Sequence, residues 1–206
     1  MSHYSCEVII PPTDDVKKSI DEVMNSFNKY EPCSWYDCYE IGGRYSGNKI
    51  IAEIGGDKIE SFIAELKKQK ITVSCIQAGK ETLAPASQQK IVDELWRKTF
   101  PDKGDVCPLF DHYKGNSNIC TVTEIPEKLS AYRLIIAGPK YSNDLREFSY
   151  ENGLTCQRML VQEFWNGVEY QRTTWDGNVK EGIEMLRAKN WPIASNWLVV
   201  TIDYHN

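Results

Sequence analysis

The stretch YSCEVIIPPTDDVKKSIDEVMNSF, residues 4–27, sets the pattern from which the fold of this chain is predicted. Residues 4–10 have the β-branched and apolar character of a strand, which the prolines that follow bring to an end. Thr13 is then expected to cap a helix, because its hydroxyl can accept a bond from an amide of the first turn. The apolar residues of that helix recur at helical spacing: Val16, Ile20, Val23 and Phe27. The chain therefore opens as a strand followed by a helix.

The same two signals alternate along the rest of the chain. Apolar or β-branched runs predict further strands at residues 71–78, 132–137 and 197–204, with a hairpin of 157–165 and 168–174 around Asn166-Gly167. The aromatic segment and its continuation, residues 49–54, are expected to form an antiparallel pair or an irregular strand and loop. Helical periodicity and caps predict three more helices: one opened by Asp57 and Glu60 as a capping box, one with Ile91, Leu95 and Trp96 on one side, and one capped by Asn178 with Val179, Ile183 and Leu186 inward.

These elements predict an α+β fold with a single mixed or antiparallel sheet and about four helices. The order β-α-β-α-β in the first half is compatible with a ferredoxin-like arrangement. We interpret residues 1–206 as one domain, with possible halves 1–100 and 119–206 joined by the loop 101–118. That loop lacks regular periodicity and is long for a connector, and such loops tend to be functional or mobile.

Composition limits the classes of function. The chain has 206 residues, of which 41% are hydrophobic and 26% charged, and no apolar run approaches the roughly 18 residues of a membrane span. The first residues carry no basic signal region, so we expect a cytoplasmic protein. A net charge of -5 argues against a partner that is a long nucleic acid, although a small anionic ligand is still compatible with it. The 7 cysteines are scattered and are expected to be reduced and largely buried.

Residues 34–47, SWYDCYEIGGRYSG, are the strongest candidate for a binding surface. Glycines let the backbone approach a ligand, arginine offers a planar fork of donors for phosphate, and aromatic faces can stack on bases. This combination suits a nucleotide. A second interpretation is a β-hairpin that turns at Gly42-Gly43, in which the rings belong to the core and Arg44 pairs with Asp37 or Glu40.

Two histidines are candidates for acid/base chemistry. His112 lies in the irregular loop, whereas Asp203 and His205 would share one face of the last strand, a geometry that suits a metal or proton transfer. Hydrogen-bonded structural histidines are the other interpretation. We expect no metal and no cofactor, because no third ligand stands at a recognisable spacing. Trp175 belongs to one of two Trp-Asx-Gly tripeptides, which serve either as turns with packed indoles or as part of a pocket with Arg172.

Several of these segments resemble a family of poorly characterised proteins found in bacteriophages and bacterial genomes. Its members have an aromatic run that ends in Gly-Gly-Arg-aromatic-Ser/Thr-Gly, then a Cys-Pro-Leu-Phe-x-His loop, and a terminal Val-Thr-x-Asp-Tyr-His. Cys38 and Tyr45 stand here where the family often has tryptophan. The resemblance implies a phage setting. The matching segments are residues 35–47, 107–112, 165–167, 175–177 and 200–205.

By analogy with small phage proteins that sequester immune signals, we expect a nucleotide sponge that blocks bacterial immune signalling without catalysis. Its ligand would be a cyclic dinucleotide or a cyclic ADP-ribose derivative, enclosed by a homo-oligomer. The alternatives are a nucleotide phosphodiesterase or hydrolase that uses His112 and His205 with Asp111 or Asp203, and an inhibitor that binds a host protein. The expected ligand-binding residues are Trp35, Tyr36, Gly42, Gly43, Arg44, Tyr45, Ser46, His112, Arg172, Trp175 and His205, with Lys49 as an alternative to Arg172.

Overall fold

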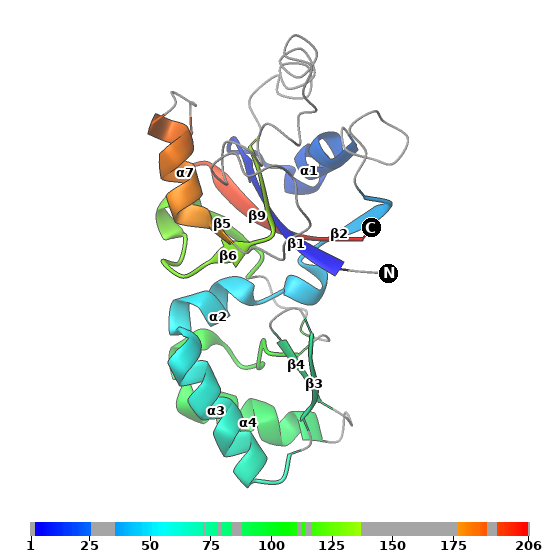
Figure 1. The fold of residues 1–206 in the computed structure, drawn as a ribbon, viewed down its shortest axis with the longest axis vertical. Helices are drawn as coiled ribbons and strands as arrows, with labels where there is room; N and C mark the ends of the chain where they lie inside the picture. The colour runs from blue at the N-terminus through cyan, green and yellow to red at the C-terminus, as the bar shows by residue number, and fades with distance from the viewer. Residues whose placement is uncertain are drawn as a thin grey trace.

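The structure is a computed structural model that describes residues 3–25, 36–71, 73–77, 80–83, 88–110, 113, 117–136, 177–188 and 193–205. Its centre is a mixed sheet in which the first and last strands of the chain lie side by side (Figure 1). β1 (His3–Ile10) pairs antiparallel with β9 (Leu198–His205) along its whole length. Both ends of the chain therefore build the same two central strands.

Three shorter strands complete this sheet within the described residues. β7 (Arg133–Ile136) lies parallel to β1 on the side away from β9. β2 (Cys38–Ile41) and β5 (Ile119–Thr121) share the other side of β9, where β2 pairs with its last residues and β5 with its first. The sheet is therefore mixed, with one parallel and three antiparallel pairings.

A hydrophobic core lies on each face of the sheet. On one face, helix α1 (Val16–Asn25) packs Ile20, Val23 and Met24 against alternate residues of β1 and β9. On the opposite face, Ile9 and Val199 pack against helix α7 (Val179–Ala188). The alternation of side chains along a strand explains why neighbouring residues of β1 belong to two separate cores.

The face that α7 covers changes from apolar to polar along the two central strands. Next to the Ile9 and Val199 pair, three successive cross-strand pairs are polar on both strands, and we call them the polar stripe. Four members are at most 7% exposed, so most of this stripe is buried rather than solvated. From the inner end outward, the pairs are Glu7 with Thr201, Ser5 with Asp203, and His3 with His205.

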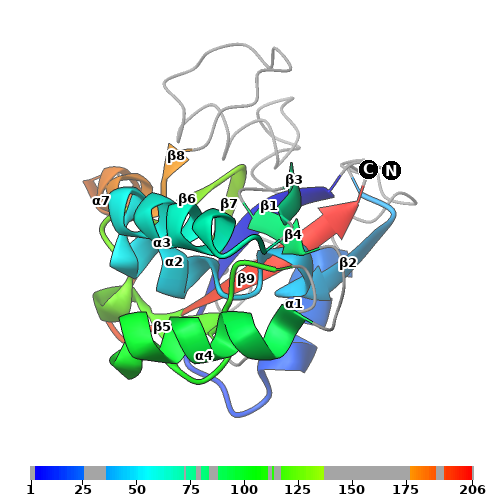
Figure 2. The ribbon, with the colours of Figure 1, turned by 90° about the horizontal axis from the view of Figure 1, so that it is seen from below.

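A helical layer covers the polar stripe and extends away from the sheet. It contains η1 (Gly43–Tyr45), α2 (Asn48–Ile54), α3 (Gly56–Lys68), α4 (Gln89–Thr99) and η3 (Pro101–Lys103), and it lies in front of the sheet in Figure 2. Its own core includes Phe62 and Trp96, whose rings meet edge to face at 5.4 Å. The other short elements are β3 (Val73–Gln77), β4 (Lys80–Leu83), η4 (Val122–Glu124), β6 (Ser130–Ala131) and β8 (Gly177–Asn178).

The α+β class with a mixed sheet is confirmed, and five α-helices are described against the expected four. The arrangement of strands differs from the expected single sheet, because β3 pairs with β4 in a separate two-stranded sheet and β6 pairs with β8 in another. The described strands therefore do not form a ferredoxin-like first half. The hairpin expected over residues 157–174 lies outside the described residues.

One element was predicted with the wrong type. Residues 49–54 were expected in an antiparallel pair or an irregular strand and loop, but they form most of helix α2. The reason lies in the spacing of the isoleucines, since Ile50, Ile51 and Ile54 all pack against the helical core. That spacing of one and three residues is typical of one helix face, whereas a strand would divide these side chains between two faces.

The helices show which of the predicted caps and apolar faces are correct. Asn178 caps α7 as predicted, because its Oδ1 accepts from the Glu181 amide at 3.0 Å. At α1 the cap is Asp15, whose Oδ1 accepts from the Lys18 amide at 3.0 Å, and not Thr13. The expected capping box of α3 is not formed, since that helix begins after Gly55 without a side-chain cap. On α4, Ile91 is 49% exposed, and Val92 and Trp96 form the buried face.

Among the described helices, none combines the length and the apolar character that crossing a membrane requires.

Candidate functional site

The loop between β2 and α2 lies directly on the polar stripe. Gly42 and Gly43 have positive φ angles of 77° and 47°, which glycine adopts without strain. The Gly42 amide donates to the Thr201 carbonyl at 2.8 Å, and the Arg44 amide donates to Asp203 Oδ2 at 3.0 Å. The diglycine motif and the terminal strand motif, which are far apart in the sequence, therefore meet in one place.

Glycine at position 43 also permits a close approach. A Cβ there would lie 2.5 Å from the Cβ and Oδ2 atoms of Asp203, closer than real Cβ atoms come to other atoms. The Cys-Pro-Leu-Phe motif, which contains Pro108, joins the same region, because a Cβ on Gly47 would lie 2.4 Å from Pro108 Cβ. The loop thus packs its backbone against the last strand on one side and against Pro108 on the other.

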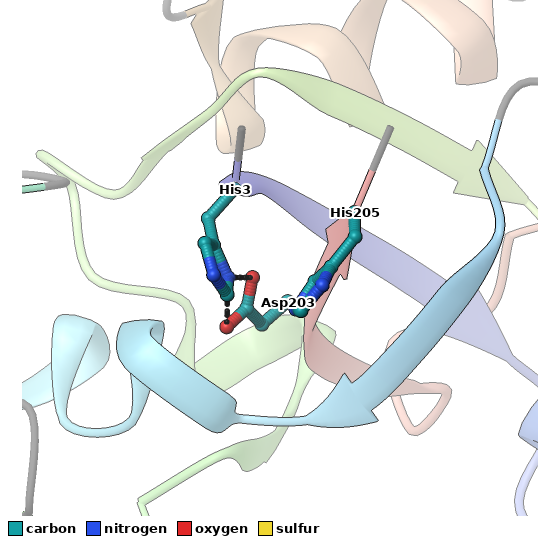
Figure 3. Close-up of side chains that lie close together, drawn as sticks. All are labelled: His3, Asp203 and His205. Carbon is teal, nitrogen blue, oxygen red and sulfur yellow. Dashed lines mark hydrogen bonds and ion pairs between the residues drawn. The ribbon is translucent and has the colours of Figure 1, made fainter. Parts of the chain in front are cut away.

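At the outer end of the polar stripe, His3, Asp203 and His205 form a cluster (Figure 3). His3 Nδ1 lies 2.9 Å from Asp203 Oδ1 and 3.0 Å from Oδ2. The two imidazole rings meet edge to face, with 3.9 Å between their centroids. Asp203 is 2% exposed, so this carboxylate is stabilised by bonds from His3 and from the Arg44 amide rather than by water.

His205 contributes a polar atom that lacks a partner. Its Nδ1 is buried and makes no hydrogen bond with any residue that the structure describes. Buried polar atoms in proteins are nearly always paired, so an unpaired one needs an explanation. One ligand atom from each of His3, Asp203 and His205 lies within 4.8 Å of the others, an arrangement that can hold a metal ion or move a proton.

A second charged group on the polar stripe has a structural role. Lys49 of α2 lies 2.8 Å from Glu7 Oε2 and donates to the Asn118 carbonyl at 3.1 Å. Thr201 donates to the other Glu7 oxygen at 2.8 Å. Lys49 and Glu7 are almost completely buried, at 5% and 1% exposure. The pair fastens α2 to the sheet, and Lys49 is therefore not available to a phosphate.

A pocket of about 440 Å³ opens beside the cluster. One wall is the start of β1, a second is η1 with α2 and the start of α3, and the third is the segment 128–132. The volume lies within the range of small-molecule sites. The lining residues are His3, Tyr4, Ser5, Tyr45, Asn48, Ile51, Ala52, Gly55, Gly56, Lys128, Leu129, Ser130 and Tyr132.

One rim of this pocket combines features that favour an anion. Gly55 is the N-cap of α3 and Gly56 its first residue, and this N-terminus has no side-chain cap and so presents backbone amides. Lys128 is exposed and makes no ion pair or hydrogen bond with any residue in the described ranges. Its Nζ reaches to 3.7 Å from the position that a Cβ on Gly55 would take. A cation and a helix N-terminus thus lie on the same rim.

The tyrosines expected as a stacking platform lie in different environments. Tyr36 is 4% exposed beneath α1, donates to the Met24 carbonyl at 2.6 Å, and has a pKa raised by burial and then by the charge of Asp21. Its ring belongs to the core. Tyr45 is 8% exposed, but its ring lines the pocket and its hydroxyl donates to the His3 carbonyl at 3.1 Å.

Other expected ligand-binding residues divide into three groups. Ser46 is buried in the loop at 5% exposure. The Arg44 side chain is half-buried, does not line the pocket, and makes no ion pair with any described residue, Asp37 and Glu40 included. At Gly42-Gly43, where a hairpin turn was expected, the chain instead begins the 3-10 helix η1. Four further residues lie outside the described ranges: Trp35, His112, Arg172 and Trp175.

Sequence reasoning missed His3 as a member of the site. The signal that could have found it is the pairing of the first and last strands, which places His3 directly opposite His205. It also missed the Lys128 rim, because nothing in the sequence indicates that residues 128–132 face α2.

Comparison with protein-family models, with curated proteins and with solved structures found no match.

Proposed function

We propose that this protein binds a small signalling nucleotide in the pocket beside β1 and α2, and sequesters it without turnover. The observation that carries the proposal is the pocket itself, about 440 Å³ in volume, with tyrosines on its walls and an anion-favouring rim. A cyclic dinucleotide or a cyclic ADP-ribose derivative combines aromatic bases with phosphates, which are the two chemistries that such a lining suits.

In this proposal the phosphate lies at the Lys128 rim, where the amides at the start of α3 can also donate to it. The base lies nearer to Tyr45, which lines the pocket, because Tyr4 and Tyr132 pack against the core beneath α1. Stacking of a base on an aromatic ring contributes about 1 to 3 kcal/mol. The Gly42 and Arg44 amides are not assigned to the ligand, because they already donate to Thr201 and Asp203.

Titration calorimetry with a panel of cyclic dinucleotides and cyclic ADP-ribose isomers tests this proposal. Lys128→Ala should weaken binding by about tenfold or more, since hydrogen bonds to charged groups contribute about 1.5 to 3 kcal/mol. Asp57→Asn, which removes the acid from the first turn of α3, should strengthen it. Lys90→Ala is the matched control, because it removes an exposed lysine from α4 away from the pocket lining. Absence of heat with every ligand of the panel would refute the proposal.

A nucleotide hydrolase is the second candidate, and one observation favours it. His3 lines the pocket and also bonds the buried carboxylate of Asp203. The His3 imidazole is therefore oriented by Asp203 and lies beside a bound ligand. Chromatography of the ligand recovered after heat denaturation separates the two candidates. Intact ligand supports sequestration, whereas converted ligand that disappears with His3→Gln supports hydrolysis.

The setting we propose follows from the resemblance to phage and bacterial proteins. The protein would act in the cytoplasm of a bacterial host, where it would lower the concentration of an immune signal. A homo-oligomer that encloses its ligand would suit this role. Light scattering with and without the ligand found by calorimetry would test whether binding depends on assembly.

A further inference from the structure

Three residues of metal-ligating type stand in one row across the end of the sheet. His3 of β1 and Cys38 of β2 are both directly opposite His205 of β9. Side chains of directly opposed residues project from the same face and lie close together. Asp203 precedes His205 by two residues, so it projects from that face as well. This row is independent of the proposed nucleotide, since it is defined by the sheet alone.

At this end of the sheet, the side chains of His3 and Asp203 are already held in position by the bond between them. Asp203 accepts from the Arg44 amide at 3.0 Å, which orients its carboxylate. The side chain of His3 is 16% exposed and that of Asp203 is 3% exposed, so little water competes for them. The unpartnered, buried Nδ1 of His205 is the second observation that points to a ligand.

We propose that His3, Asp203 and His205 bind one divalent transition-metal ion of the zinc class. Imidazole nitrogen and carboxylate oxygen are the donors that such ions take, whereas Mg²⁺ and Ca²⁺ prefer oxygen alone. The ligand atoms lie within 4.8 Å of one another. Bonds of about 2.0 to 2.2 Å require a closer triangle, so the side chains draw together by roughly an ångström when the ion binds.

The surroundings of this triad fit the proposal. The Arg44 amide supplies the outer hydrogen bond that ligating carboxylates normally have. Three protein ligands leave one coordination position of a tetrahedral ion open. His3 also lines the pocket, whereas Asp203 and His205 do not, so the open position can meet a molecule in the pocket only on the His3 side. A bound nucleotide could use it, but binding of the ion does not depend on the nucleotide.

Another triad shares His205 and must be distinguished by experiment. Asp37, Cys38 and His205 also offer ligand atoms within 4.8 Å of one another. Asp37 and Cys38 are both exposed, and the Asp37 carboxylate has no outer hydrogen bond among the described residues. The buried triad is therefore the one that we assign.

Titration of Zn²⁺ into the untagged, chelator-treated chain tests the assignment, with calorimetry and thermal unfolding as readouts. We expect one ion per chain and a higher melting temperature with the ion. His3→Gln, His205→Gln and Asp203→Asn should each weaken binding by more than about 100-fold, because loss of an outer-shell partner alone costs about 10- to 100-fold. Asp105→Asn, an exposed carboxylate outside the cluster, should leave the affinity unchanged.

Cys38→Ser separates the two triads. Unchanged Zn²⁺ affinity in this variant, and a Co²⁺ complex without a thiolate charge-transfer band, support the buried triad. Loss of binding in Cys38→Ser while His3→Gln binds normally would overturn it, as would absence of stoichiometric Zn²⁺ binding to the unaltered chain. No nucleotide is present in these measurements, so their outcome is separate from that of the proposed function.

Discussion

Gly43 lies against Asp203 so closely that a Cβ on the glycine would come within 2.5 Å of the carboxylate oxygen Oδ2. The amide of the next residue, Arg44, donates to that same oxygen at 3.0 Å. The glycine motif therefore serves first to let a backbone amide reach a buried acid of the last strand. Ligand binding, where we propose it, uses the neighbouring pocket.

Gly43→Ala should destabilise the protein by about 2 to 4 kcal/mol. A residue other than glycine in this backbone region costs about 1 to 2 kcal/mol, and displacement of Asp203 adds to that cost. Denaturant unfolding measures the change. Gly104→Ala gives a comparison for backbone strain alone, since Gly104 has φ 89° and ψ 173°, a region essentially restricted to glycine, and nothing lies within 4 Å of an added Cβ. A loss below about 1 kcal/mol in Gly43→Ala would contradict the expected effect of backbone strain and of the contact with Asp203.

Lys49→Met should cost about 3 to 5 kcal/mol, because it leaves the buried Glu7 carboxylate without its ion-pair partner. Lys68→Met provides the comparison, since Lys68 and Glu65 form an exposed pair whose side chains are 75% and 44% accessible. Such pairs contribute about 1 kcal/mol at most. Chemical denaturation of both variants measures the difference. A loss below 1 kcal/mol for Lys49→Met would contradict the anchoring role of this pair.

We expect Glu124 to make the stability of the fold depend on pH. Its pKa is held below the usual value by bonds from the backbone amide and then the hydroxyl of Thr121. A folded-state pKa that is depressed stabilises the fold above the unfolded value, about 4.3, and this contribution disappears as the pH falls through the folded value. The stability difference between the unaltered chain and Glu124→Ala should therefore shrink below about pH 4.3. A difference that grows on acidification would contradict the predicted sign.

Cys38 should react with iodoacetamide before the other described cysteines whose exposure is known. It is exposed, whereas Cys6 and Cys107 are buried. Burial raises the pKa of Cys120 to about 11, so at pH 8 only about a thousandth of that thiol is the reactive thiolate. Peptide mapping after brief alkylation measures the order. Faster modification of Cys120 than of Cys38 would be inconsistent with these environments.

Much of the fold could be predicted because its signals are local. The strand pattern of the first residues, the Asn178 cap and the apolar faces of α1 and α7 each depend on residues within a few positions of one another. Helix α2 was missed because three isoleucines close together fit either a strand or a helix, and only the core they face decides between the two.

The site was less predictable, because its parts come from distant segments. Asp203 and His205 were expected to share a face, since a strand alternates its side chains. The expectation that no third ligand exists was made from spacing along the chain, and spacing cannot reveal that β1 runs beside β9. The distinction between Tyr36 in the core and Tyr45 on the pocket wall likewise depends on where α1 and α2 pack.

The sequence by itself determined the α+β class, four of the five described α-helices, the strands β1, β3, β7 and β9, and the position of Asp203 and His205 on one face. Periodicity, caps and prolines act over a few residues, so these features can be derived without knowledge of the rest of the chain. Only the tertiary structure decided that His3 joins them, that the diglycine loop holds Asp203, and that Lys128 faces the start of α3. Those contacts join segments up to 200 positions apart, and the packing of the whole chain sets them.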